Sequence, residues 1–113
     1  MGVVNQVVAS AARTVTGQSS AIGPTSDPRV SLFVNVSASS GTIPTLDLTI
    51  EWSQDAGTTW AVAQPADSYT QITTTGTVVK QFTVKAPHYR VKWTITGTTP
   101  SFTFAVSEYS TAN

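Results

Sequence analysis

The stretch that decides the fold reads Thr45-Leu46-Asp47-Leu48-Thr49-Ile50-Glu51-Trp52-Ser53. Apolar and polar side chains alternate along it, which is the pattern of a β-strand with one face in a core and the other facing outward. Four more runs share this alternation: residues 29–37, 78–84, 88–96 and 101–107. Residues typical of turns separate the runs at roughly ten-residue intervals. We therefore predict an all-β fold, an antiparallel β-sandwich or jelly roll.

The composition excludes several classes of function. Charged residues make up 11% of the 113 residues, against about 25% in an ordinary soluble domain. Six basic and six acidic residues cancel, so we expect no nucleic-acid partner. The chain has no cysteine and one histidine, so we expect no metal site and no cofactor. No apolar run is long enough to cross a bilayer, and residues 1–12 lack a basic n-region. We therefore expect no membrane partner and no secretion signal.

The N-terminal quarter differs from the rest of the chain. Residues 14–28 are rich in Gly, Ser and Pro and show no alternation. We predict an extended N-terminal arm at residues 1–28 and a β-sandwich body at residues 29–113. Valines favour a strand at the start of the arm. This strand could add to another subunit's sheet or be the first strand of its own sandwich. The residues that would make the contact are Val3, Val4, Val7 and Val8.

One local motif follows the strand at residues 45–53. The sequence Ser53-Gln54-Asp55-Ala56-Gly57-Thr58-Thr59-Trp60 matches the Asp-box pattern Ser-x-Asp-x-Gly-x-x-Trp. An aspartate at this spacing can accept hydrogen bonds from the turn backbone, and Gly57 can take a positive φ. Trp60 would then plug the start of the next strand. We predict a structural hairpin formed by Ser53, Asp55, Gly57 and Trp60.

The carboxylates do not suggest catalysis. Asp47 and Glu51 share a strand face, and four residues at about 3.3 Å each place them roughly 13 Å apart. Glycosidase carboxyl pairs need about 5–9.5 Å, so we predict instead that the pair faces Arg90 and Lys92 across strands.

A hydrolytic triad is also poorly supported. His88 is the only imidazole, and the chain has no Gly-x-Ser-x-Gly elbow. A minimal glycosidase using Asp55 or Asp67 is the least favoured hypothesis. We predict a protein that is not an enzyme and has no catalytic residues.

Most aromatic residues occupy positions of the predicted strands that face the core. Phe33 does not, so we predict that it faces outward. Aromatic residues are enriched at protein interfaces, and a subunit contact is favoured over sugar stacking.

Four segments, residues 9–14, 40–47, 51–60 and 89–104, resemble small proteins encoded in the structural gene clusters of tailed bacteriophages. The resemblance covers most of the chain. It implies a virion protein, in the first place a capsid decoration (cement) protein. Such a protein is a homotrimer on the outside of the head, bound to the major capsid protein across neighbouring subunits, and has no catalytic residues. The alternatives are a tail, neck or fibre-attachment protein, or a carbohydrate-binding adhesion module that recognises surface glycans. Ala56 stands where the pattern more often has glycine.

Overall fold

The structure, a computed structural model, describes residues 3–25 and 27–111. It confirms the all-β class, with antiparallel strands and no helix among the described residues. The strands are β1 (Val3–Arg13), β2 (Gly17–Gln18), β3 (Arg29–Ser53), β4 (Ala61–Ser68), β5 (Gly76–Thr83) and β6 (His88–Thr111). They form one six-stranded sheet in the order β1-β6-β3-β4, with β2 added to β6 and β5 added to β3. The finer assignment to a sandwich or jelly roll stays a prediction.

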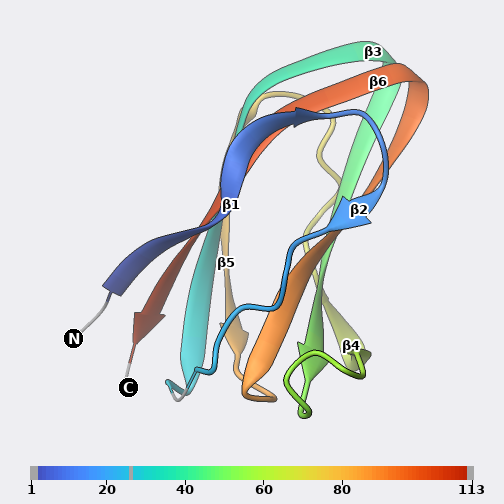
Figure 1. Cartoon of the computed structure of the whole chain (residues 1–113). Coiled ribbons are helices and arrows are strands. Elements are labelled where there is room, and N and C mark those ends of the chain that lie inside the picture. Colours follow the sequence, from blue (N-terminus) through green and yellow to red (C-terminus); the bar gives the residue numbers. More distant parts are fainter. Residues whose placement is uncertain (1–2, 26, 112–113) are drawn as a thin grey trace.

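Two long strands give the molecule its shape. β3 and β6 pair with each other from end to end and fold over together in the middle (Figure 1). The first layer contains β1, β5, residues 29–38 of β3 and residues 102–111 of β6. The second layer contains β2, β4, residues 46–53 of β3 and residues 88–95 of β6. The core lies between the two layers.

The fold-over, which we call the crest, comprises residues 39–45 and 96–101. Sequence reasoning places turns here that end separate strands, but the ladder continues through the crest at the pair Thr42 and Thr98. Two related motifs, Gly41-Thr42-Ile43-Pro44 and Gly97-Thr98-Thr99-Pro100, face each other. Each glycine has a positive φ, 110° and 127°, and so does each third residue, 49° and 46°. These left-handed positions bend both strands without breaking their pairing.

The alternating residues meet in the core as the sequence predicts. Inward positions of β3 and β6 alternate with outward ones in both layers. The buried apolar residues are Val8, Val30, Leu32, Val34, Val36, Leu46, Leu48, Ile50, Trp52, Phe82, Tyr89, Val91, Trp93, Ile95, Phe102, Phe104 and Val106. The rings of Trp93 and Phe104 meet edge to face, with centroids 5.4 Å apart, and join the layers near the crest.

The N-terminal segment follows β6 along most of its length. β1 pairs with residues 102–110 of β6 in the same chain, and β2 pairs with Lys92 and Trp93. Further along, the backbone N–H groups of Ile22 and Thr25 donate to the carbonyls of Tyr89 and Pro87. The stretch predicted as an arm therefore packs on both layers.

Candidate functional site

The loop from Ser53 to Trp60 is held by its own polar side chains. The hydroxyl of Ser53 donates to Oδ1 of Asp55 at 2.8 Å, and the same hydroxyl accepts from the backbone N–H of Gly57 at 2.8 Å. Oδ1 of Asp55 also accepts from the backbone N–H of Thr59 at 2.8 Å. Gly57 has a φ of 95°. The residues predicted to build the hairpin thus lie together in one hydrogen-bonded loop.

The hydrogen bonds within this loop also affect the pKa of Asp55. The backbone N–H of Thr59 and the hydroxyl of Ser53 hold the pKa of the exposed Asp55 carboxyl below its ordinary value. Trp60 is half-buried, and the guanidinium of Arg90 lies 4.4 Å from its ring centroid. The same guanidinium pairs with Glu51 at 2.6 Å, so the predicted cross-strand charge pair forms at these two residues.

The other candidate polar residues are dispersed. Oδ2 of Asp67 accepts from the indole N–H of Trp52 at 2.7 Å and pairs with Lys85 at 2.9 Å. His88 starts β6 opposite Ser53, and its Nδ1 makes no hydrogen bond within the described residues. Over residues 3–25 and 27–111, no three His, Cys, Asp or Glu side chains gather as metal ligands would.

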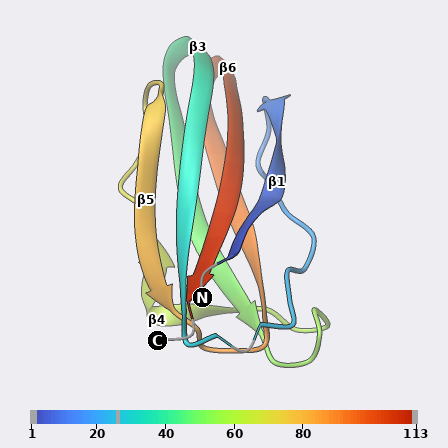
Figure 2. The same cartoon turned by 90° about the vertical axis from the view of Figure 1, so that its left-hand side faces the viewer.

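The outer side of the first layer is the most distinctive surface, and Figure 2 shows this layer face-on, with β5, β3, β6 and β1 in order. Its outward positions form cross-strand rows. Four apolar residues on it are exposed: Phe33 (41%), Val79 (52%), Tyr109 (38%) and Val4 (69%). We call this surface the uncharged face; it consists of Val4, Gln6, Ser31, Phe33, Asn35, Thr77, Val79, Gln81, Ala105, Ser107 and Tyr109.

Phe33 lies at the centre of that face. It is paired with Val79 on β5 and with Ser107 on β6. Of the predicted interface valines, Val4 is exposed on the same face, Val7 is half-buried and Val8 belongs to the core. The side chain of Val3 lies outside the described residues.

The outer side of the second layer is different. Its outward positions carry the charged residues Asp47, Glu51, Arg90 and Lys92, whereas the rows of the uncharged face carry no charge and Arg29 lies at their end. The two outer surfaces of the folded sheet are therefore chemically distinct.

Both edges of the first layer carry features that oppose strand addition. On β1, the guanidinium of Arg13 donates to the carbonyls of Ala9 (2.8 Å) and Ala11 (3.0 Å). On β5, Lys80 stands at an inward position, and its ammonium donates to the carbonyl of Ser68 at 2.6 Å. Occupied edge carbonyls and an inward charge both oppose edge-to-edge pairing. A partner is thus better accommodated on the face than on an edge.

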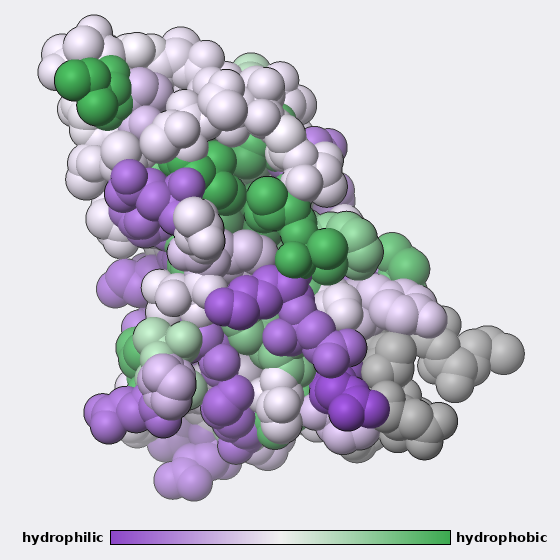
Figure 3. Space-filling view, turned by 180° about the vertical axis from the view of Figure 1, so that it is seen from behind, coloured by the Kyte–Doolittle hydropathy of each residue, from purple (hydrophilic) through white to green (hydrophobic). Residues whose placement is uncertain are grey.

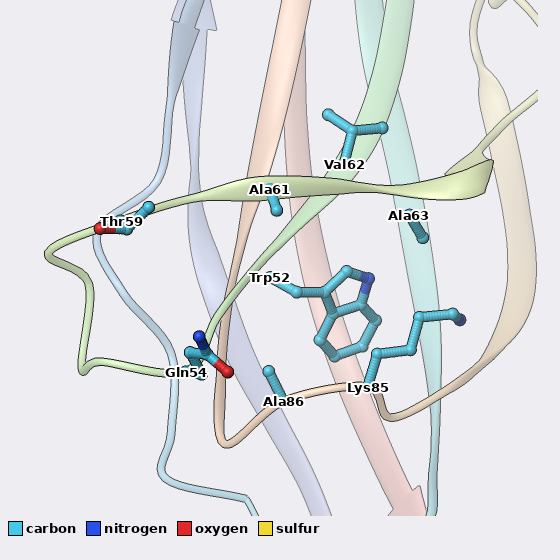
Figure 4. A pocket seen from close by; sticks show the side chains of 8 residues that line it. All are labelled: Trp52, Gln54, Thr59, Ala61, Val62, Ala63, Lys85 and Ala86. Carbon is cyan, nitrogen blue, oxygen red and sulfur yellow. The ribbon is translucent and has the colours of Figure 1, made fainter.

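A pocket of about 330 Å³ lies at the end of the molecule away from the crest. Figure 4 shows Ala61 and Ala63 of β4 on one side of the Trp52 indole and Ala86 on the other. Lys85 crosses the ring, with its ammonium 5.4 Å from the ring centroid. Because Asp67 pairs with Lys85, the pocket is apolar with a compensated charge at its rim. Sequence reasoning missed this pocket because Lys85 and Ala86, much further along the chain, complete a site that the hairpin of β3 and β4 begins.

Comparison with known proteins finds no family model and no curated protein that matches this chain. Among the described residues, no helix is long and apolar enough to cross a membrane.

Proposed function

We propose that this chain is a bacteriophage virion structural protein, a capsid decoration protein that binds the head by contact and not by catalysis. The observation that carries the proposal is the uncharged face, with Phe33 at its centre and Val79, Tyr109 and Val4 around it. The folded-over sheet also fits the sandwich or jelly-roll body that the resemblance implies.

The chemistry of this face suits burial against another protein. Burying an unpaired charge is costly, and the rows of this face contain none. Its hydroxyl and amide groups can exchange bonds to water for bonds to a partner, and its exposed apolar side chains gain by leaving water. The charged outer side of the second layer would then face solvent on the capsid exterior.

The size of the face bears on how it is used. Four strands at about 4.8 Å spacing and eight residues at about 3.3 Å give a footprint of roughly 500 Å². A typical stable interface buries about 800 Å² on each partner. A single copy would therefore bind weakly, and self-association as a homotrimer would combine several faces on neighbouring capsid subunits.

The test is cosedimentation of the purified chain with heads that lack it. We expect the wild type to sediment with the heads, and Phe33→Asp and Val79→Asp to raise the dissociation constant at least tenfold, about 1.4 kcal/mol. Val15→Asp is the matched control, because Val15 is 70% exposed and belongs to the connection between β1 and β2, not to the rows of this face. Wild-type protein that fails to bind heads and is absent from virions would refute the proposal.

Two further measurements separate the alternatives. A cryo-EM map of the virion distinguishes the head from the tail, neck or fibre attachment by location. A glycan array with wild type and Phe33→Ala tests adhesion, and a signal that depends on Phe33 would favour the carbohydrate-binding alternative instead.

A further inference from the structure

The crest carries the most exposed large apolar side chain among the described residues. Ile43 is 82% exposed at the point where β3 folds over. Figure 3, from behind, shows the end of the molecule that bears the crest as weakly polar, with one isolated strongly hydrophobic group. Residues 39–45 and 96–101 contain no charge, so apart from Ile43 the crest consists of hydroxyl groups, backbone groups and the rings of Pro44 and Pro100.

The backbone at Ile43 is unusual for this residue type. Its φ is 49°, a region in which a β-branched side chain is strained. The carbonyl of Ile43 lies 2.8 Å from the position that a Cβ on Gly97 would take, so the opposite strand packs closely against this backbone. The crest therefore exposes the aliphatic side chain of Ile43, which we call the projection, on an uncharged bend where two strands pack closely.

The same chain contains a pocket of matching chemistry at its other end. The pocket at Trp52 is lined by alanines and the indole, and Gln54 and Thr59 supply polar groups at its rim. Its volume of about 330 Å³ admits an isoleucine side chain and part of the neighbouring backbone. The ion pair of Lys85 with Asp67 leaves no uncompensated charge to attract an ionic ligand, which favours a neutral, apolar occupant.

We infer that copies of this chain associate head to tail, with Ile43 of one copy seated in the Trp52 pocket of the next. Projection and pocket are different surfaces, so the contact is heterologous, the kind that a cyclic trimer requires. The contact leaves the uncharged face free in every copy. This inference deepens the self-association in the proposed function and rests on it; head binding by the face is measured separately, so either can fail alone.

The test uses two variants with complementary defects. Ile43→Asp removes the projection, and aspartate tolerates a positive φ, so the fold is retained. Ala61→Arg fills the pocket at an exposed position of β4. In sedimentation velocity, the wild type should oligomerise, and each variant should weaken association at least about 30-fold. Gln18→Asp should associate like the wild type, because Gln18 is exposed and pairs with Lys92, away from both the crest and the pocket.

Mixing the two variants gives the decisive readout. Ile43→Asp retains an intact pocket and Ala61→Arg an intact projection, so an equimolar mixture should form a heterodimer and nothing larger. Because the contact is apolar, the wild-type oligomer should change little between low and high salt. A wild type that is monomeric at every concentration, variants that assemble like the wild type, or a mixture without heterodimer would each overturn the inference. Circular dichroism checks that both variants fold.

Discussion

Tyr89 and Glu108 lie 19 residues apart on the same strand, yet the hydroxyl of Tyr89 donates a 2.5 Å hydrogen bond to Oε1 of Glu108. They meet because β6 folds over at the crest and returns on the other side of the core. Glu108 is 8% exposed. The pair therefore fastens the two layers together far from the fold-over, with a buried carboxylate that depends on a donor.

Replacing Tyr89 with phenylalanine removes that donor. A hydrogen bond to a charged group contributes about 1.5–3 kcal/mol, so we expect Tyr89→Phe to lower the free energy of unfolding by about 2 kcal/mol in urea titrations. Glu108→Gln is the control background, because a neutral amide is less costly to leave unpaired. An equal cost of Tyr89→Phe in both backgrounds would contradict the role of the carboxylate.

Alkaline pH tests the burial of two tyrosines. Burial raises the pKa of Tyr89 and of Tyr69 above the ordinary value of 10.0. Their stability contribution is complete below that value and is lost as the pH rises above it, because the unfolded chain ionises first. We expect stability to fall by up to about 1.4 kcal/mol per pH unit for each. Tyr69→Phe should reduce that slope by about half, measured from urea midpoints between pH 9 and 11, and an unchanged slope would argue against a buried Tyr69.

Local patterns predicted much of the fold. Apolar and polar side chains alternate along any strand that has one face in a core. This pattern predicts which residues of β3 and β6 face the core. The loop at Ser53 is also predictable from the sequence, because each of its hydrogen-bond donors lies within four residues of its acceptor. The alternation alone predicts that Phe33 faces outward, and it is exposed.

Features formed by residues far apart in the sequence could not be predicted from local patterns. Two Gly-Thr-x-Pro segments read as turns, and only their mutual pairing shows that they bend continuous strands. Lys80 is a charged residue at an inward position of β5, where the alternation predicts an apolar one. Its ammonium donates to the carbonyl of Ser68, which lies 12 residues away in the sequence. The pocket at Trp52 likewise depends on Lys85 and Ala86 lying beside the hairpin of β3 and β4, and the contact of Arg13 with the Trp93 ring depends on the fold-over.

Arg13 is predicted to protect the edge of β1 and to hold its end against the core. Its guanidinium donates to the carbonyl of Phe104 at 2.8 Å and lies 4.5 Å from the Phe104 ring centroid. An ammonium cannot reproduce this planar arrangement, so we expect Arg13→Lys to cost about 1–2 kcal/mol in urea unfolding. With the carbonyls of Ala9 and Ala11 released, aggregation should also rise in light scattering. Wild-type behaviour of Arg13→Lys in both assays would show that positive charge alone suffices.

Acid pH tests the hairpin. The pKa of Asp55 is lowered, so its contribution is present above the ordinary value of 3.8 and is lost as the pH falls through the folded-state pKa. Asp55→Asn keeps an acceptor for Thr59 without the charge. The stability difference between wild type and Asp55→Asn should therefore be largest at neutral pH and shrink toward pH 2, measured by urea midpoints. A difference that stays constant with pH would mean that the charge of Asp55 contributes nothing to the loop.

A pair of glycines tests whether close packing at the crest sets the fold-over. A Cβ on Gly97 would lie 2.8 Å from the carbonyl oxygen of Ile43, whereas a Cβ on Gly76 would meet nothing within 4 Å. Both have positive φ, 127° and 146°, so an alanine at either position is strained by its own backbone. Gly97→Ala must also separate two paired strands, so it should lower the free energy of unfolding by at least about 2 kcal/mol more than Gly76→Ala. Equal losses in urea unfolding would show that the close approach is dispensable, and the bend would then depend on backbone conformation alone.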